Sequence, residues 1–113
     1  MATHGRTFRL FTNTSTGAEP GDEAAHKNST QATGYEAIAQ VSLSNFTGDT
    51  FSLEIQGRLN DSLPWGELVS ITEADINSNG SGFVAFRMVP HLRVETLALS
   101  GVGVGHLTVD VMN

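Results

Sequence analysis

Residues 51–59 read FSLEIQGRL, and this stretch decides the class of fold. Its apolar side chains fall at alternate positions, on one face of an extended chain: Phe51, Leu53, Ile55 and Leu59. Successive side chains of a strand leave opposite faces of the sheet, so this period predicts a strand with one buried face. Residues 60–64 then read NDSLP, a composition typical of a turn. The next apolar run, at residues 68–71, predicts an antiparallel neighbour.

The same pattern recurs along the later part of the chain. Further strands are predicted at residues 37–43, 67–72, 83–89, 91–99 and 106–112. Turn signals separate the expected strands at intervals of about 8–12 residues, the spacing of a sandwich or jelly roll. No segment has the period of a long amphipathic helix. We therefore predict an all-β fold, a single antiparallel β-sandwich or jelly-roll-like domain with a long polar N-terminal arm.

The sequence changes character near Gly34. Residues 12–33 are rich in Thr, Ser, Asn, Gly and Ala, and they contain no large apolar side chain. Such a segment buries too little surface to offset the entropy lost on ordering. We therefore expect an N-terminal arm, residues 1–34, followed by a β-sandwich domain, residues 35–113. The arm carries one short strand-like apolar patch, made of Phe8, Leu10 and Phe11.

Composition restricts the classes of function. The 113 residues suit one domain, and the absence of cysteine excludes disulfides and thiolate metal sites. The chain has 12 acidic and 6 basic residues, and the basic ones are scattered. Nucleic-acid binding needs a dense positive surface, so no nucleic-acid partner is expected. No run is long enough to span a membrane and the first residues lack an apolar signal core, which predicts a soluble protein made in the cytoplasm.

No catalytic, cofactor or metal site is predicted, and we do not expect an enzyme. The four histidines lack the spacing of a metal site, and no Gly-x-Ser-x-Gly motif is present. The run Asp75-x-Asn77-x-Asn79-Gly80 begins like a calcium-binding loop. Phe86 occupies the position where that loop needs a bidentate glutamate. The run is therefore interpreted as a hairpin loop, with a weak calcium site as the alternative.

Two segments resemble the small virion structural proteins of tailed bacteriophages. The first is FSLEIQGRLND at residues 51–61, followed by Trp65. The second runs from PHLRV through LALSG to LTV, within residues 90–109. The resemblance covers about Val41 to Val111. In those proteins, acidic cysteine-free β domains decorate the capsid or form part of the tail.

The resemblance implies a non-enzymatic virion protein, made in the host cytoplasm, and first of all a capsid decoration (cement) protein. It would bind the major capsid protein, or another virion protein, through its N-terminal arm and edge strands. The anchors of the arm would be Phe8, Leu10 and Phe11. Removing the arm should then abolish capsid binding and leave the β domain folded. A homo-oligomer is expected, and capsid symmetry favours a trimer; a tail or head–tail component is the next interpretation.

A carbohydrate-binding β-sandwich module is the alternative from another class. Trp65 would offer its ring as a stacking platform for a sugar. The hydrogen-bonding groups beside it would be Arg58, Asn60 and Asp61. Discoidin-like sugar- and lipid-binding jelly rolls have a similar turn, which in this chain lacks their Asp-Gly pair. Alternatively, the tryptophan fills one end of the sandwich beside Phe51 or Phe83.

Overall fold

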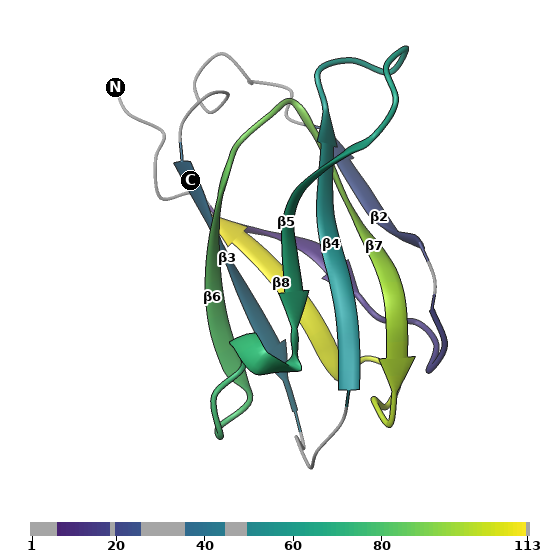
Figure 1. The fold of residues 1–113 in the computed structure, drawn as a ribbon, viewed down its shortest axis with the longest axis vertical. Coiled ribbons are helices and arrows are strands. Elements are labelled where there is room, and N and C mark those ends of the chain that lie inside the picture. The colour runs from purple at the N-terminus through teal and green to yellow at the C-terminus, as the bar shows by residue number, and fades with distance from the viewer. Residues whose placement is uncertain (1–6, 19, 26–35, 45–49, 113) are drawn as a thin grey trace.

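The computed structural model describes residues 7–18, 20–25, 36–44 and 50–112, whose strands form two four-stranded sheets (Figure 1). The first sheet has the order β1 (Thr7–Thr12), β8 (Leu107–Met112), β3 (Glu36–Leu43), β6 (Ser81–Arg87). The second has the order β2 (Pro20–Ala25), β7 (His91–Ser100), β4 (Thr50–Arg58), β5 (Gly66–Thr72). A 3₁₀ turn, η1 (Glu73–Asp75), connects β5 to β6.

All neighbouring strands are antiparallel, and the two sheets face each other. The order 1-8-3-6 over 2-7-4-5 is that of an eight-stranded jelly roll, in which two Greek keys are folded onto one another. The predicted all-β sandwich is confirmed. Within the described residues, no helix is long and apolar enough to cross a membrane.

Strand β4 shows why the sequence forms this sandwich. From Phe51 to Gly57 its alternate residues are buried, and the residues between them are half-exposed. Strands β3 and β8 alternate in the same way. Each sheet therefore presents one apolar face, and the two faces pack together because apolar surface is removed from water.

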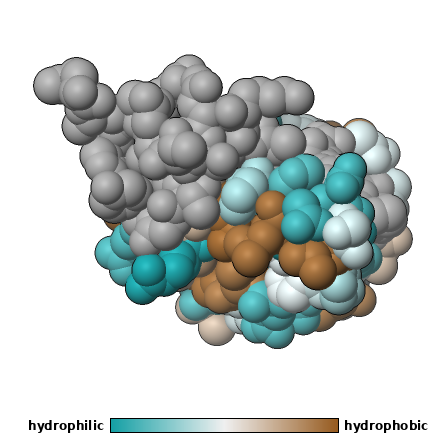
Figure 2. Space-filling view, turned by 90° about the horizontal axis from the view of Figure 1, so that it is seen from above, coloured by the Kyte–Doolittle hydropathy of each residue, from teal (hydrophilic) through white to brown (hydrophobic). Residues whose placement is uncertain are grey.

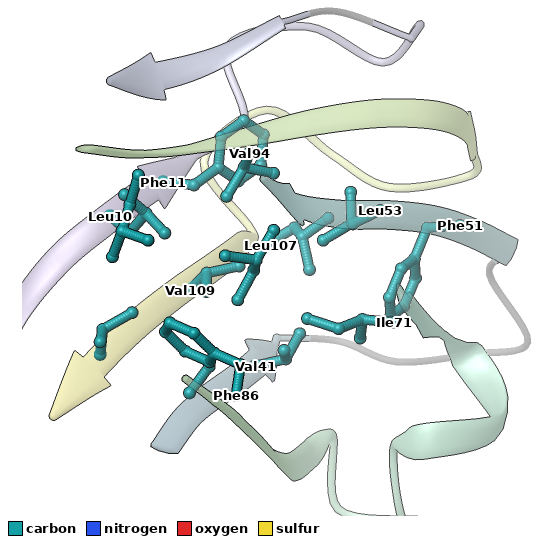
Figure 3. Packing of buried hydrophobic residues seen from close by; sticks show 14 of the residues in the cluster. Leu10, Phe11, Val41, Phe51, Leu53, Ile71, Phe86, Val94, Leu107 and Val109 are labelled. Atoms are coloured by element: carbon teal, nitrogen blue, oxygen red, sulfur yellow. The ribbon is translucent and has the colours of Figure 1, made fainter. Parts of the chain in front are cut away.

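The core lies between the sheets and draws on both of them. Figure 3 shows Val41, Leu107 and Val109 of the first sheet pointing toward Leu53 and Val94 of the second. These side chains are essentially inaccessible to solvent. Burying an aliphatic side chain of this size contributes about 1.5–3 kcal/mol. The packing of the two faces is therefore the main source of stability in the molecule.

Strand β1 belongs to this core because a β-bulge changes its register. Arg9 pairs with Asp110 and Phe11 pairs with Val109, so Leu10 is the extra residue of the bulge. A bulge places two consecutive side chains on one face. Leu10 and Phe11 are accordingly both buried in the core, each with 1% of its surface exposed.

The expected boundary at residue 34 does not match the structure. Strand β1 pairs with β8 along the first sheet, and β2 pairs with β7 along the second. Residues 7–12 and 20–25 are therefore strands of the sandwich, not part of a separate arm. Both strands form at the edge of a sheet, where main-chain hydrogen bonds to one neighbour suffice. Residues 13–18 are the described part of the connection between these strands, and residues 1–6, 19 and 26–34 of the expected arm lie outside the described residues.

The strand registers define two ends of the sandwich. At the upper end in Figure 1, β4 ends beside the start of β7, where Arg58 pairs with His91. The connection from β4 to β5 lies at this end. At the lower end, β3 ends beside the starts of β6 and β8, where Ser42 pairs with both Ser81 and Thr108. The two ends carry different surfaces.

Candidate functional site

The residues predicted as capsid anchors lie inside the protein. Leu10 and Phe11 are part of the core, and Phe8 packs against it while remaining partly exposed. A side chain buried between the sheets cannot contact a partner unless the strand leaves the sandwich. The expectation that Phe8, Leu10 and Phe11 anchor an arm is therefore replaced by a structural role in the core.

The structure does bring together two of the predicted ligand-binding residues. Trp65 lies at the upper end, just before β5, and the guanidinium carbon of Arg58 is 4.1 Å from the centre of its ring. A second arginine, Arg93 of β7, lies 4.6 Å from the same centre. Each contact is a cation–π interaction. Trp65 therefore packs with two arginines on the outer face of the second sheet. It lies where β4 ends, whereas Phe51 lies where β4 begins.

Arg93 was not singled out from the sequence because its role depends on strand pairing. It lies on β7 opposite Gln56 of β4, 37 residues away along the chain. Its Nε donates to Gln56 Oε1 at 2.8 Å, and a terminal nitrogen lies 3.3 Å from Glu95 Oε1. Gln56 Nε2 donates in turn to Glu54 Oε1 at 2.8 Å. These polar contacts hold the Arg93 guanidinium in place beside the indole.

The other two predicted ligand residues have different positions. Asn60 Oδ1 accepts hydrogen bonds from the Ser62 main-chain nitrogen at 2.9 Å and from Ser62 Oγ at 2.6 Å. This is the geometry of an Asx turn, in which the side chain shapes the loop. Asp61 is exposed at the same turn. The Asn60 side chain is occupied by the loop, and two guanidinium groups pack on the Trp65 ring. The ring is therefore not an open platform on which a sugar could stack.

We call the group at this end the apex surface; it consists of the half-buried Arg58, Trp65 and Arg93 and the exposed Leu59 and Leu63. Leu59 is 61% exposed and Leu63 is 41% exposed. Figure 2 looks onto this end and shows hydrophobic residues at the surface, with hydrophilic residues beside them. Tryptophan and arginine are enriched where protein interfaces bind most strongly, and contiguous exposed apolar surface marks interaction sites.

A second candidate surface lies at the lower end, on the outer face of the first sheet. A hollow of about 290 Å³ opens there between the end of β3 and the loops that lead into β6 and β8. Its side chains include Gln40, Ser42, Ser81, His106 and Thr108. Among the described residues that line it, none is Asp, Glu, Lys or Arg. We call this feature the polar hollow; the sequence did not indicate it, because its residues come from three strands that are far apart along the chain.

The calcium-like run has structural partners for two of its side chains. Asp75 Oδ2 accepts from the Thr72 main-chain nitrogen at 2.9 Å and caps η1. Asn77 Oδ1 accepts from the main-chain nitrogens of Asn79 at 3.1 Å and Ser81 at 3.2 Å. These contacts match the interpretation as a hairpin loop. Among the described residues, no three His, Asp or Glu side chains are grouped so that they could hold a metal ion.

Comparison with known proteins finds no matching family model, no matching curated protein and no matching solved structure.

Proposed function

We propose that this chain is a non-enzymatic virion structural protein, a capsid decoration protein that binds the major capsid protein through its apex surface. The resemblance of residues 51–61 and 90–109 to small phage virion proteins motivates the proposal. The jelly-roll strand order supports it at the level of fold, since viral capsid domains use the same order. Lectins and cupins use that order too, so the site must carry the argument.

The observation that carries the proposal is the composition of the apex surface. Tryptophan and arginine dominate the energetic centres of protein–protein interfaces. Here Trp65 is held by two arginines, and Arg93 is fixed further by Gln56 and Glu95. A group that is ordered before binding loses little entropy when a partner docks. Leu59 and Leu63 add exposed apolar area beside it.

The sheet edges provide a second means of assembly. Among the described strands, β1 and β6 are the edges of the first sheet, and β2 and β5 are the edges of the second. Strands β5 and β6 lie beside each other along one side of the sandwich. An edge strand can accept a strand from a neighbour through main-chain hydrogen bonds. We therefore include subunit contacts through these edges, in a homo-oligomer placed on the capsid.

The apex surface can be tested without disturbing the core. The double variant L59S/L63S should lose binding to capsids that lack this protein, because both side chains are exposed and supply the apolar area. Loss of at least about tenfold in affinity is expected, which corresponds to about 1.4 kcal/mol. Co-sedimentation with purified capsids measures it.

The matched control is Leu97→Ser. Leu97 is 53% exposed but lies on β7 near the lower end, where Ser100 pairs with Thr50. This variant should bind capsids like the unchanged protein. If L59S/L63S binds as well as Leu97→Ser, the apex surface is not the attachment site. Binding to isolated tails instead of capsids would favour the head–tail or tail alternative.

A further inference from the structure

The polar hollow has a regular construction that the proposed function does not use. Ser42 of β3 pairs with Thr108 of β8 on one side and with Ser81 of β6 on the other. Directly paired residues share a face of the sheet, with Cβ atoms about 5 Å apart. The three hydroxyl groups therefore form a row across three adjacent strands. All three residues are partly exposed and line the hollow.

Amide and imidazole groups complete the lining. Gln40 lies two residues before Ser42 on the same face, and its Nε2 donates to Ser81 Oγ at 3.0 Å. Asn79 and His106 belong to the loops on either side. These groups can each donate or accept hydrogen bonds, and none of the described residues that line the hollow carries a permanent charge. Such a set suits a neutral ligand with many hydroxyl groups, and it offers no cation to hold a phosphate, sulfate or carboxylate.

An exposed aromatic ring lies next to the hydroxyl row. Phe83 of β6 pairs with Gln40 and lies two residues after Ser81, so it shares their face. It is 65% exposed, although phenylalanine is usually buried. An aromatic ring in this position offers an apolar platform for the C–H face of a sugar ring. The hydroxyl and amide groups beside it would then meet the hydroxyl groups of the sugar.

The walls of the hollow are fixed by main-chain hydrogen bonds. At the end of β3, Leu43 donates to the carbonyl of Gly80 at 2.7 Å, and Ser44 donates to the carbonyl of His106 at 3.0 Å. Gly80 and Gly105 have φ angles of 85° and 80°, which glycine adopts without strain and which the two tight turns require. Because both loops are tied to β3, ligand binding would order few additional groups.

We propose that the polar hollow and Phe83 form a binding site for a neutral saccharide. A hexose or N-acetylhexosamine unit would stack on Phe83 and make hydrogen bonds with the row Thr108–Ser42–Ser81 and with Gln40. The site lies at the lower end of the sandwich and the apex surface lies at the upper end. A copy attached to a capsid through its apex would therefore present the hollow outward. Many copies on one particle would then bind a glycan-coated surface with high avidity.

The test uses the full chain and a panel of neutral hexose and N-acetylhexosamine oligosaccharides, with anionic saccharides for comparison, followed by titration in ¹H–¹⁵N correlation spectra. Saturable shifts are expected at the amides of Ser42, Ser81, Phe83 and Thr108. Phe83→Ala should weaken binding about five- to tenfold or more, because the stacking platform is lost. Ser42→Ala removes the central hydroxyl and should weaken it as well. Both side chains reach the surface, so both variants should keep the spectrum of a folded protein.

Trp65→Ala separates this site from the tryptophan-based alternative. Binding at the polar hollow should survive Trp65→Ala, since the indole lies at the other end of the sandwich. The proposal is overturned if no member of the panel binds. It is overturned equally if only anionic saccharides bind, or if Trp65→Ala abolishes binding while Phe83→Ala and Ser42→Ala do not. None of these results bears on capsid attachment, which L59S/L63S tests independently.

Discussion

At the scale of single residues, Asn13 shows how one polar side chain holds distant segments together. It is buried, with 1% of its surface exposed, at the end of β1. Its Oδ1 accepts from the Leu107 nitrogen at 2.9 Å, and its Nδ2 donates to the carbonyls of Ser15 at 3.0 Å and Gly103 at 2.9 Å. These bonds join the β1–β2 connection to the loop between β7 and β8. Asparagine is tolerated here because its amide makes three hydrogen bonds at a site closed to water.

Asn13→Ala should therefore destabilise the protein. The substitution leaves the buried Leu107 nitrogen and two carbonyls without their partner, and each unsatisfied buried group costs about 1–3 kcal/mol. We expect a loss of about 2–4 kcal/mol in the free energy of unfolding, after partial compensation by water. Urea denaturation followed by circular dichroism measures it.

Asn60→Ala is the control for this prediction. It removes the same amide from an exposed Asx turn, where water can replace the lost bonds. Its cost should stay below about 1 kcal/mol. Equal costs for the two substitutions would contradict the role assigned to Asn13.

The alternation of Phe51, Leu53 and Ile55 could be interpreted correctly from sequence because it is a local property of one strand. The burial of both Leu10 and Phe11 could not, since it depends on a bulge opposite β8. The contact between Arg93 and Trp65 could not be predicted from sequence either, because it depends on the pairing of β7 with β4. Local patterns report which face a side chain occupies, whereas its neighbours on that face come from other strands.

At the scale of elements, β3 to β8 were predicted to within two residues at each end. Their apolar runs and the turn residues between them are strong signals. Strand β2 was missed because PGDEAA has neither alternation nor a large apolar residue. It is an edge strand, held by main-chain bonds to β7, and such a strand needs little apolar signal. Strand β1 was recognised as strand-like but was assigned to the arm.

The assignment of β1 to the sandwich predicts the result of a truncation. Deleting residues 1–12 should unfold the protein or leave it without cooperative thermal unfolding. The deletion removes Leu10 and Phe11 from the core, and losing a single buried side chain of this kind costs about 2–5 kcal/mol. It also exposes the edge of β8, which favours aggregation. Differential scanning calorimetry and size-exclusion chromatography measure the two effects.

The opposite result has a clear meaning. The truncated chain could instead unfold cooperatively, with a midpoint temperature close to that of the full chain. Residues 1–12 would then be a detachable arm, as the sequence predicted. This result would also restore Phe8, Leu10 and Phe11 as candidate anchors. Phe8→Ala is a milder companion, because this side chain is only partly buried and should cost less than Phe11→Ala.

At the scale of the whole molecule, the sequence predicted either a simple β-sandwich or a jelly roll and could not distinguish their strand orders. Sandwich and jelly roll share the spacing of strands and turns, and they differ in which strands pair. The pairing that distinguishes them here is non-local: β1 pairs with β8, and β2 with β7. The polar hollow likewise depends on the non-local pairing of β3 with β6 and β8, and Arg93 reaches Trp65 through the pairing of β7 with β4. The sequence therefore indicated Arg58 and Trp65 but neither the hollow nor Arg93.

The two ends of the sandwich carry surfaces of different composition. The upper end carries Trp65, two arginines and exposed leucines, a composition suited to a protein partner. The lower end carries a neutral row of hydroxyl groups beside Phe83. The formal net charge of −6 makes copies of the chain repel one another, so the proposed assembly would need specific docking.

The measurement that tests the proposed function most directly is quantitative mass spectrometry of purified virions from a phage whose genome carries this sequence. A capsid decoration protein should be present at a copy number comparable to that of the major capsid protein. A handful of copies per particle would contradict decoration of the capsid and indicate a tail or vertex component. Absence from the particle would contradict the virion role altogether.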